Sequence, residues 1–321
     1  MSNSYRLSLL GLPEIKTLDD LALLTRLSKS FLYKLWKFNN NYYKSLTIPK
    51  ANGEPRKLLC PSGDLKAVQG WILRNILNRV FISEYATAYV KNKNLLNNVY
   101  PHNGNKYFLC IDLKNFFPSI NYPKVFSIFN LLGYEKLVCH FLAGLCTKDG
   151  FLPQGGVTSP CLSNIVCVRI DRRISGFTGK RNITYTRYAD DMTFSSMNPN
   201  LFKRTIEVVE KIVGDDGFKI NVDKTRILGP RQRRKITGLA ISSDAIGVGR
   251  IKKKELRAKI YNYFKNKRFN TQEENQKIDA EIKGWFSYLE KIDPIGHRQM
   301  IKYHLKKKRE NKTGKNEPDS F

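Results

Sequence analysis

The segment TYTRYADDMTFS (184–195) restricts the fold more than any other part of the sequence. Thr, Tyr, Met and Phe favour a half-buried strand, whereas Asp is among the poorest strand residues and is costly to bury without a partner. Neighbouring strand residues point to opposite faces of a sheet, so Asp190 and Asp191 can serve one site only at a turn or a bulge. The alternating residues on both sides predict a β-hairpin with the two acids at its tip.

A third acid, Asp112, ends another predicted strand. The run KYFLCIDL (106–113) is apolar almost throughout, which is typical of a buried strand. Two adjacent acids alone are more typical of a polar turn, but three acids brought together by strands favour a site for hard cations such as Mg²⁺. Two ions held about 3.5–4 Å apart would activate a hydroxyl group and stabilise a leaving pyrophosphate. The pattern therefore predicts nucleotide polymerisation.

Charge and composition indicate a partner rich in phosphate. Lys and Arg total 56 against 28 acidic residues, a formal net charge of +28, and the excess is concentrated after residue 230. A surface this positive attracts polyphosphate, with strong salt dependence. We expect no membrane partner, because no apolar run could span a bilayer and the first residues lack the features of a signal peptide. Six cysteines without CxxC or zinc-finger spacing predict buried thiols in a reducing cytoplasm.

The order of periodic segments predicts an α+β fold. The chain has 321 residues, 41% of them hydrophobic, which is enough for a sizeable core and two or three subdomains. Strands are expected on both sides of an Asn-Gly turn within 47–61 and at 218–228, and helices at 18–38, 64–81, 202–213 and within 151–177. We expect a mostly antiparallel sheet with helices on one face, followed from about residue 250 by a basic helical subdomain.

Four segments resemble the palm motifs of reverse transcriptases, in the same order and spacing. They are FLCIDLKNFFPSI, LPQGGVTSPCLSN, YTRYADDMTFS and GFKINVDKT, and the whole chain resembles the retron-type bacterial branch. The resemblance implies an RNA-directed DNA polymerase with a right-hand fold. Its parts would be N-terminal helices and fingers at 1–100, a palm at 101–240, and a basic helical thumb and tail at 241–321.

The resemblance also implies roles for palm residues. Asp112 and Asp190 match metal-binding aspartates, Asp191 matches the adjacent acid, and the expected cofactor is a pair of Mg²⁺ ions, with Mn²⁺ as a substitute. Tyr188 matches the aromatic residue beside the primer end. Phe117 matches the ring that excludes a ribonucleotide 2′-hydroxyl, although plain core packing is the alternative and is our interpretation of the neighbouring Phe116.

Further matched residues would bind the incoming nucleotide. Gln154 would line it, while Gly155 and Gly156 would let the backbone approach the template base pair, the alternative being a tight turn. Arg56 would clamp the triphosphate with its planar fork, with Lys50 as a companion. Lys224 matches a lysine that protonates pyrophosphate, but a lysine on a strand is as often simply exposed.

Two short elements point to retrons. Asn98 and His102 in NNVYPH resemble the Asn-Ala-x-x-His element of the family with Val in place of Ala, and Thr237 and Gly238 in KITGLAIS resemble its Val-Thr-Gly element with Ile in place of Val. We assign them to RNA recognition, the alternative for His102 being a loop histidine.

The retron resemblance implies particular partners. The enzyme would bind the structured non-coding RNA of its own retron, start DNA from the 2′-hydroxyl of an internal guanosine, and convert dNTPs into a branched RNA–DNA hybrid (msDNA). It would act in anti-phage defence with an effector protein and depend on host RNase H, since the residues after 230 show no acidic cluster of that kind.

Other functions remain open from the sequence. A group II intron-type or diversity-generating reverse transcriptase is one alternative, although no maturase or endonuclease segment follows the thumb. An inactive RNA-binding scaffold is another, but a pure binder gains nothing from three acids near a phosphate. RIKKKELRAKIYNYFKNKRF (250–269) suits a helix along an A-form duplex. A solvated charged helix is the simpler reading of such a run.

Overall fold

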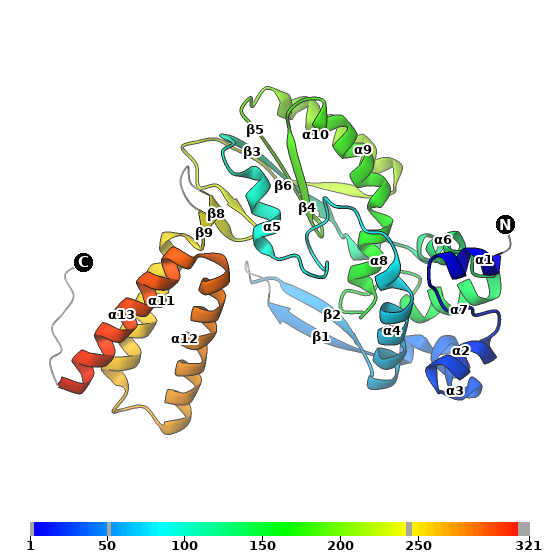
Figure 1. Cartoon of the computed structure of the whole chain (residues 1–321), viewed down its shortest axis with the longest axis horizontal. Helices are drawn as coiled ribbons and strands as arrows, with labels where there is room; N and C mark the ends of the chain where they lie inside the picture. Colours follow the sequence, from blue (N-terminus) through cyan, green and yellow to red (C-terminus); the bar gives the residue numbers. More distant parts are fainter. Residues whose placement is uncertain (1–2, 50–52, 242–245, 314–321) are drawn as a thin grey trace. The chain divides into compact units, whose positions relative to one another are not determined.

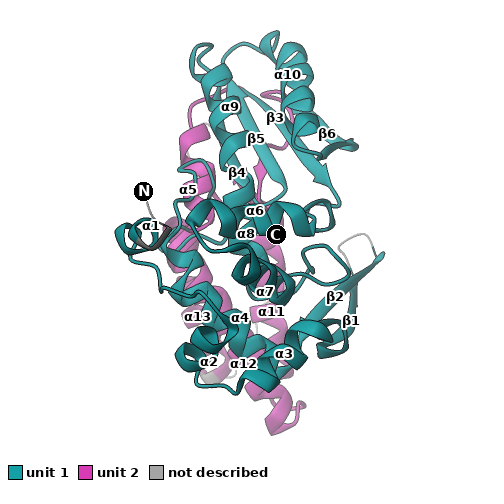
Figure 2. Ribbon diagram, turned by 90° about the vertical axis from the view of Figure 1, so that its right-hand side faces the viewer, with its two compact units in different colours: residues 1–93, 107–227 teal, residues 94–106, 228–321 magenta. Residues whose placement is uncertain are grey.

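A computed structural model of the chain describes residues 3–49, 53–241 and 246–313. The chain divides into two compact units, one formed by residues 1–93 and 107–227 and the other by residues 94–106 and 228–321 (Figures 1 and 2). The polypeptide passes from one unit to the other at 93/94, 106/107 and 227/228. The predicted division at residues 100 and 240 does not follow these boundaries and stays a prediction about functional parts.

The first unit begins with helices and a two-stranded sheet. Its early elements are α1 (Asn3–Leu9), α2 (Leu18–Thr25), α3 (Lys29–Lys37), the 3₁₀ turn η1 (Asn39–Tyr42), β1 (Tyr43–Pro49), β2 (Pro55–Pro61), α4 (Gly63–Asn75) and the 3₁₀ turn η2 (Leu77–Arg79). β1 and β2 pair antiparallel, as predicted for the two strands around the Asn-Gly turn.

The single helix predicted at 18–38 is two helices. Arg26 takes a left-handed conformation with φ 57° and ends α2, and the Ser28 hydroxyl accepts from the Phe31 amide to begin α3. An N-cap serine satisfies an amide that the first turn leaves unpaired, so it favours a new start over a continuous helix. The helix predicted at 64–81 likewise ends early, at Asn75.

A four-stranded sheet, in the order β4-β5-β3-β6, carries the rest of this unit. The strands are β3 (Tyr107–Lys114), β4 (Thr184–Tyr188), β5 (Asp191–Ser196) and β6 (Lys219–Leu228). The other elements are the 3₁₀ turn η4 (Phe117–Ser119), α6 (Tyr122–Leu132), α7 (Lys136–Cys146), α8 (Ser159–Val166), α9 (Val168–Gly179) and α10 (Leu201–Asp215). α9 packs on both β4 and α10 (Figure 1). The α+β prediction is confirmed.

The buried side chains of the first unit form one core cluster. Phe129, Phe194 and Phe202 are among its largest fully buried members. Burial of a phenylalanine side chain contributes about 1.5–3 kcal/mol. The core therefore fixes the strands whose ends carry the acids.

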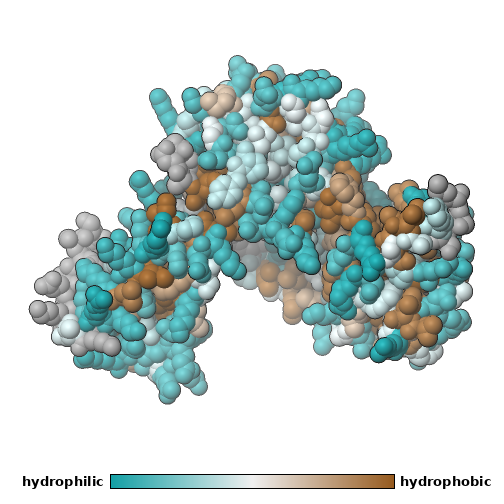
Figure 3. Space-filling model, in the orientation of Figure 1, coloured by the Kyte–Doolittle hydropathy of each residue, from teal (hydrophilic) through white to brown (hydrophobic). Residues whose placement is uncertain are grey.

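The second unit combines an internal segment of the chain with its C-terminal part. Its elements are α5 (Leu95–Val99), the 3₁₀ turn η3 (Tyr100–His102), β7 (Lys235–Ile236), β8 (Leu239–Ile241), β9 (Ile246–Gly247), α11 (Gly249–Asn266), α12 (Gln272–Ile292) and α13 (Pro294–Thr313). The three strands pair in the order β7-β8-β9. α11, α12 and α13 pack on one another, and their visible face is mostly hydrophilic (Figure 3).

The cysteines and the long helices bear on the expectations of buried thiols and of no membrane partner. The six cysteines lie in the described part of the chain and are free; four are buried, but Cys60 and Cys110 are partly exposed. The expectation of buried thiols is thus met at four positions. None of the helices that the structure describes combines the length and the apolar character needed to cross a membrane.

Candidate active site

The predicted hairpin forms the centre of the site. β4 ends at Tyr188 and β5 begins at Asp191, which leaves Ala189 and Asp190 as a two-residue turn. Ala189 has a φ of 59°, in the left-handed region that L residues rarely adopt. The Leu113 amide donates to the Asp190 carbonyl at 3.1 Å and joins the turn to β3.

The strand register brings Asp112 to the hairpin tip. Asp112 on β3 lies directly opposite Asp191 on β5. Directly opposite residues of an antiparallel pair point to the same face, with Cβ atoms about 4.5–5.5 Å apart. The structure therefore brings together the acids from two segments that are separated by 78 residues of sequence, from 112 to 190.

Polar groups from β6 surround the Asp112 carboxylate, which is 6% exposed. The Lys224 ammonium lies 3.0 Å from Oδ1 and 3.1 Å from Oδ2. The Asn221 amide donates to Oδ1 at 3.0 Å. The Lys224 side chain is 61% exposed, so its ammonium group can move away from the carboxylate at little cost in packing.

The two hairpin acids are difficult to ionise. Burial, and then the charge of Asp112, raises the pKa of Asp190. Burial of the carboxyl group, together with the charges of Asp190 and Asp112, raises the pKa of Asp191 to about 6, although the residue as a whole counts as exposed. Lys224 lowers both pKa values without cancelling these effects. Like charges held this way gain stability when a cation binds.

Two aromatic residues predicted at the site lie beside the acids in the chain and are partly buried. Tyr188 pairs with Asp191 across the hairpin. Phe117 begins the 3₁₀ turn after β3 and meets Phe116 edge to face, with ring centroids 5.4 Å apart. Phe116 is 3% exposed and packs on Phe218, so its interpretation as a core residue is confirmed.

The glycines of the PQGG turn are required by close packing within the chain. Gly155 has a φ of 119°, and a Cβ atom there would lie 2.8 Å from the carbonyl oxygen of Leu59 on β2. A Cβ at Gly156 would lie 2.6 Å from Ser159 Oγ. The Leu59 amide donates to the Gln154 carbonyl at 2.8 Å, so this turn is fastened to β2. Approach to a template base pair stays a prediction.

β2 also carries the predicted phosphate clamp. Arg56 is exposed, pairs with Ile48 on β1, and is near enough to the hairpin for its charge to lower the pKa of Asp190. Lys50, its predicted companion, lies outside the described residues.

Comparison with known proteins decides the family. The family model described as "Reverse transcriptase (RNA-dependent DNA polymerase)" matches residues 48–241. The chain is 40% identical over 316 residues to the Retron Ec86 reverse transcriptase of Escherichia coli, covering 98% of this chain and 96% of that protein. It is a member of the retron-type reverse transcriptases. The Retron Mx162 reverse transcriptase of Myxococcus xanthus is 30% identical over 329 residues, with 91% of this chain and 67% of that protein covered.

Solved structures similar to this reverse transcriptase are more distant. A foamy viral protease-reverse transcriptase in complex with double-stranded DNA gives a TM-score of 0.43 at 20% identity, over 78% of this chain and 38% of that one. Telomerase from Candida albicans gives 0.48 at 13% identity, over 81% of this chain and 55% of that one.

Members of the reverse transcriptase family depend on divalent metal ions, and the residues present fit that requirement. Among residues 3–49, 53–241 and 246–313, no three His, Cys, Asp or Glu side chains are already arranged as a metal site. The donors are nevertheless carboxylate oxygens, which hard divalent ions prefer, and two of them have raised pKa values. A cation, the Lys224 ammonium, already lies against Asp112. Its departure would open the carboxylates to an ion.

The retron elements of the reverse transcriptase come together within the second unit. Asn98 and His102 are 0% exposed, and the Asn98 amide donates to the Thr237 hydroxyl at 3.5 Å. Thr237 and Gly238 both have positive φ, 46° and 84°. Burial lowers the pKa of His102 to about 3, so the imidazole is neutral at physiological pH. Both side chains are interior, and a role in RNA recognition stays a prediction.

Several residues near the acids were not predicted from the sequence. Asn221 on β6 donates to Asp112. Tyr89 has a φ of 60° and lies near enough to Asp190 for that charge, after burial, to raise its pKa. Arg187 and Asp171 form an ion pair with both side chains 0% exposed. A single sequence marks none of them, since Asn, Tyr and Arg are common on strands and loops.

Proposed function

We propose that this retron reverse transcriptase copies the structured non-coding RNA of its own retron from dNTPs, starting at the 2′-hydroxyl of an internal guanosine, and that the product is msDNA. The family establishes RNA-directed DNA synthesis in a retron. The choice of RNA, the 2′-primer and the branched product extend that activity. Nearly full-length similarity to the Retron Ec86 reverse transcriptase is the observation that carries the proposal.

Asp112, Asp190 and Asp191 would hold a pair of Mg²⁺ ions, or Mn²⁺ as a substitute. Such ions activate the attacking hydroxyl and stabilise the pyrophosphate that leaves. Because the pKa of Asp191 is raised to about 6, protons compete with the metal at that carboxylate below about pH 6. Asn221 keeps Asp112 oriented, since its amide donates to one carboxylate oxygen.

Lys224 would have two successive tasks. Its ammonium neutralises Asp112 when no metal is present. Once freed, the flexible and mostly exposed side chain stays near the acids and can donate a proton to the pyrophosphate, a task that suits a lysine with a mobile stem.

The nucleotide would lie beside the hairpin, with its phosphates toward Arg56. An arginine fork can bind a phosphate bidentately, and Arg56 is exposed on β2 with its charge acting on Asp190. Phe117 would exclude a ribonucleotide because its ring is supported from behind by Phe116. Gln154 would line the nucleotide from a turn fastened to β2, and Tyr188 would contact the primer end.

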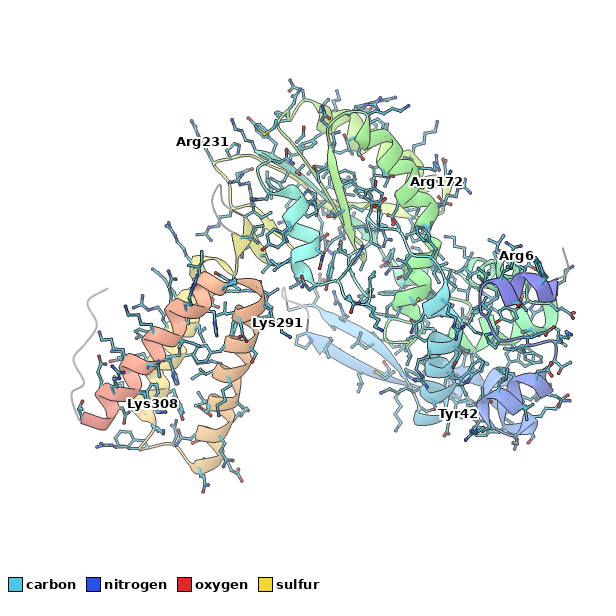
Figure 4. All side chains as sticks on the ribbon, viewed as in Figure 1. Arg6, Tyr42, Arg172, Arg231, Lys291 and Lys308 are labelled. Atoms are coloured by element: carbon cyan, nitrogen blue, oxygen red, sulfur yellow. The ribbon has the colours of Figure 1, made fainter. Side chains whose placement is uncertain are left out.

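Basic helices of the second unit would bind the RNA and the growing duplex. Lys291 and Lys308, labelled in Figure 4, extend from α12 and α13. α11 carries the sequence RIKKKELRAKIYNYFKN, in which most cations precede the aromatic residues, and two of the three rings, Tyr263 and Phe264, are buried. Cations bind the phosphate backbone, and the partly exposed ring of Tyr261 could stack on an unpaired base. Asn98, His102, Thr237 and Gly238 would give this surface its shape.

Three further features complete the proposal. The polymerase would work in the cytoplasm, where dNTPs and host RNase H are present. RNase H would remove copied template RNA. A separate effector protein would join the msDNA complex in anti-phage defence, the biological setting that we propose for this retron.

The test is DNA synthesis on the RNA encoded beside the gene. Purified protein, that RNA, Mg²⁺ and labelled dNTPs are incubated with wild type, Asp190→Asn and a matched control, Asp64→Asn, an exposed acid in the first turn of α4. We expect wild type and the control to join DNA to the RNA through a bond that a 2′,5′-debranching enzyme cleaves, and Asp190→Asn to make none.

Each other outcome identifies a rival. Synthesis only from an added DNA or RNA primer would favour a group II intron-type or diversity-generating enzyme. RNA binding with no synthesis by wild type would favour the inactive scaffold. Activity retained by Asp190→Asn would remove the hairpin acid from the site.

A further inference from the structure

A buried arginine lies directly behind the hairpin tip. Arg187 on β4 is 0% exposed, as is its partner Asp171 on α9. Asp171 precedes Arg172, which Figure 4 labels. Burying a charged pair costs several kcal/mol per ion before the attraction is counted, and a hydrophobic pair of similar size is often as stable or more stable. Stability alone therefore explains this pair poorly.

The guanidinium is held by bonds in several directions. Its Nε donates to Asp171 Oδ1 at 2.8 Å and one terminal nitrogen donates to Oδ2 at 2.7 Å, so the pair is bidentate. The other terminal nitrogen donates to Asn164 Oδ1 on α8 at 3.0 Å. The Tyr185 hydroxyl also donates to Asp171 Oδ1, at 2.8 Å. A bidentate pair fixes the plane of the guanidinium as well as its place.

The same nitrogen that meets Asn164 also donates to the carbonyl oxygen of Ala189 at 3.2 Å. This carbonyl belongs to the peptide that joins Ala189 to Asp190. Its orientation therefore sets the direction in which the chain enters Asp190. Ala189 has a φ of 59°, and such conformations cost about 1–3 kcal/mol and persist where the surroundings hold them.

The backbone of Arg187 is held as well. Its amide donates to the Tyr85 carbonyl at 2.8 Å, and its carbonyl accepts from the Thr87 amide at 2.8 Å and the Thr87 hydroxyl at 3.0 Å. Asn164 in turn donates to the Ala88 carbonyl at 2.8 Å. The Arg187 backbone and the Asn164 side chain that binds its guanidinium are therefore both anchored.

We propose that Arg187 is a positioning residue for the polymerase reaction: fixed by Asp171 and Asn164, it holds the Ala189 carbonyl and so keeps the Asp190 and Asp191 carboxylates directed at Asp112. Groups that orient metal ligands from behind typically change metal affinity or activity about 10- to 100-fold when removed. The inference rests on the proposed assignment of these acids to metal binding.

The test uses a neutral replacement, Arg187→Gln with Asp171→Asn, which leaves no unpaired buried charge. The matched control is Arg173→Gln with Asp215→Asn, because Arg173 on α9 and Asp215 on α10 form an Arg–Asp pair at 2.6 Å away from the hairpin. Mn²⁺ binding is measured directly by electron paramagnetic resonance, and kcat, KM for dNTP and the metal concentration for half-maximal rate are measured on a generic primed RNA template.

We expect the Arg187 and Asp171 replacement to weaken Mn²⁺ binding and lower kcat about 10- to 100-fold, with KM for dNTP changed less than about threefold. The control should match wild type in all four quantities. If the neutral replacement does not fold, Arg187→Lys gives the same readouts, because lysine keeps the charge beside Asp171 but lacks the fork that also reaches Ala189.

A folded variant of either kind with wild-type Mn²⁺ binding and kcat would overturn the inference. The experiments distinguish a failure of this inference from a failure of the proposed function. If wild type copies a primed template but makes no branched product on its own RNA, the retron proposal fails while the Arg187 comparison remains valid. If Asp190→Asn as a single substitution leaves Mn²⁺ binding unchanged, the assignment of these acids to metal binding is wrong. The inference about Arg187 then fails as well.

Discussion

Replacing Asp191 by Asn should stabilise the metal-free protein at pH 8. The pKa of this carboxyl group rises from 3.8 to about 6 on folding. A group whose pKa is higher in the folded state stabilises the fold fully below the unfolded pKa, and that stabilisation is lost as the pH rises through the folded pKa. Above about pH 6 the ionised carboxylate therefore weakens the fold relative to a neutral side chain.

The size of the effect follows from the shift and from exposure. A difference of roughly two pKa units corresponds to about 3 kcal/mol of unfolding free energy. Because Asp191 is exposed to solvent, screening reduces this value, and we expect a gain of about 1 kcal/mol for Asp191→Asn. At pH 5, between the two pKa values, the gain should be about half as large.

The assay is urea unfolding followed by circular dichroism, in chelator, at pH 8 and pH 5. Asp64→Asn serves as the control, since it removes an exposed acid in the first turn of α4 and should leave stability unchanged or slightly lower. Added Mn²⁺ should stabilise wild type more than Asp191→Asn. A variant less stable than wild type at pH 8, or an equal gain at both pH values, would refute the reasoning.

Three other changes test the remaining parts of the site. Lys224→Met should move the acidic limb of the pH–rate profile to higher pH at a fixed low metal concentration, because the Lys224 charge lowers the pKa of both hairpin acids. A limb that stays in place or moves to lower pH would contradict this. Phe117→Ala should reduce discrimination against ribonucleotides by roughly 10- to 200-fold, measured as the ratio of kcat/KM for dNTP and rNTP; unchanged discrimination would leave Phe117 as packing alone. Gly155→Ala should cost about 2–4 kcal/mol in urea unfolding, because Gly155 has a positive φ and the added Cβ would push Leu59 away from the Gln154 carbonyl that its amide binds, and it should raise KM for dNTP. A neutral effect on both would show that the turn can shift.

The hairpin and its acids could be predicted because their signals are local. The strand-forming residues on both sides of Asp190 indicated a hairpin tip, and the apolar run before Asp112 indicated a strand that ends near that residue. One local signal was available and was missed: Ser28 is a typical N-cap residue, and it divides the helix expected at 18–38.

The contacts between distant segments could not be predicted from one sequence. β4 is buried along its middle rather than on alternate residues, so nothing in its pattern marks Arg187 as an interior charge. Asn98 meets Thr237 across 139 positions of sequence, and no periodicity encodes such a pairing. Lys224 was predicted as either an exposed lysine or a proton donor, and its contact with Asp112 depends on a strand order that a single chain does not reveal.

The polypeptide crosses between its two units three times, and this limits how chimaeras of retron enzymes can be built. Residues 94–106 are covalently flanked by one unit but packed in the other, with Asn98, Val99 and His102 buried there. A chimaera made by exchanging everything after residue 227 would place a foreign C-terminal part against a native 94–106. Exchange of this unit between retron enzymes therefore requires that residues 94–106 and 228–321 be transferred together.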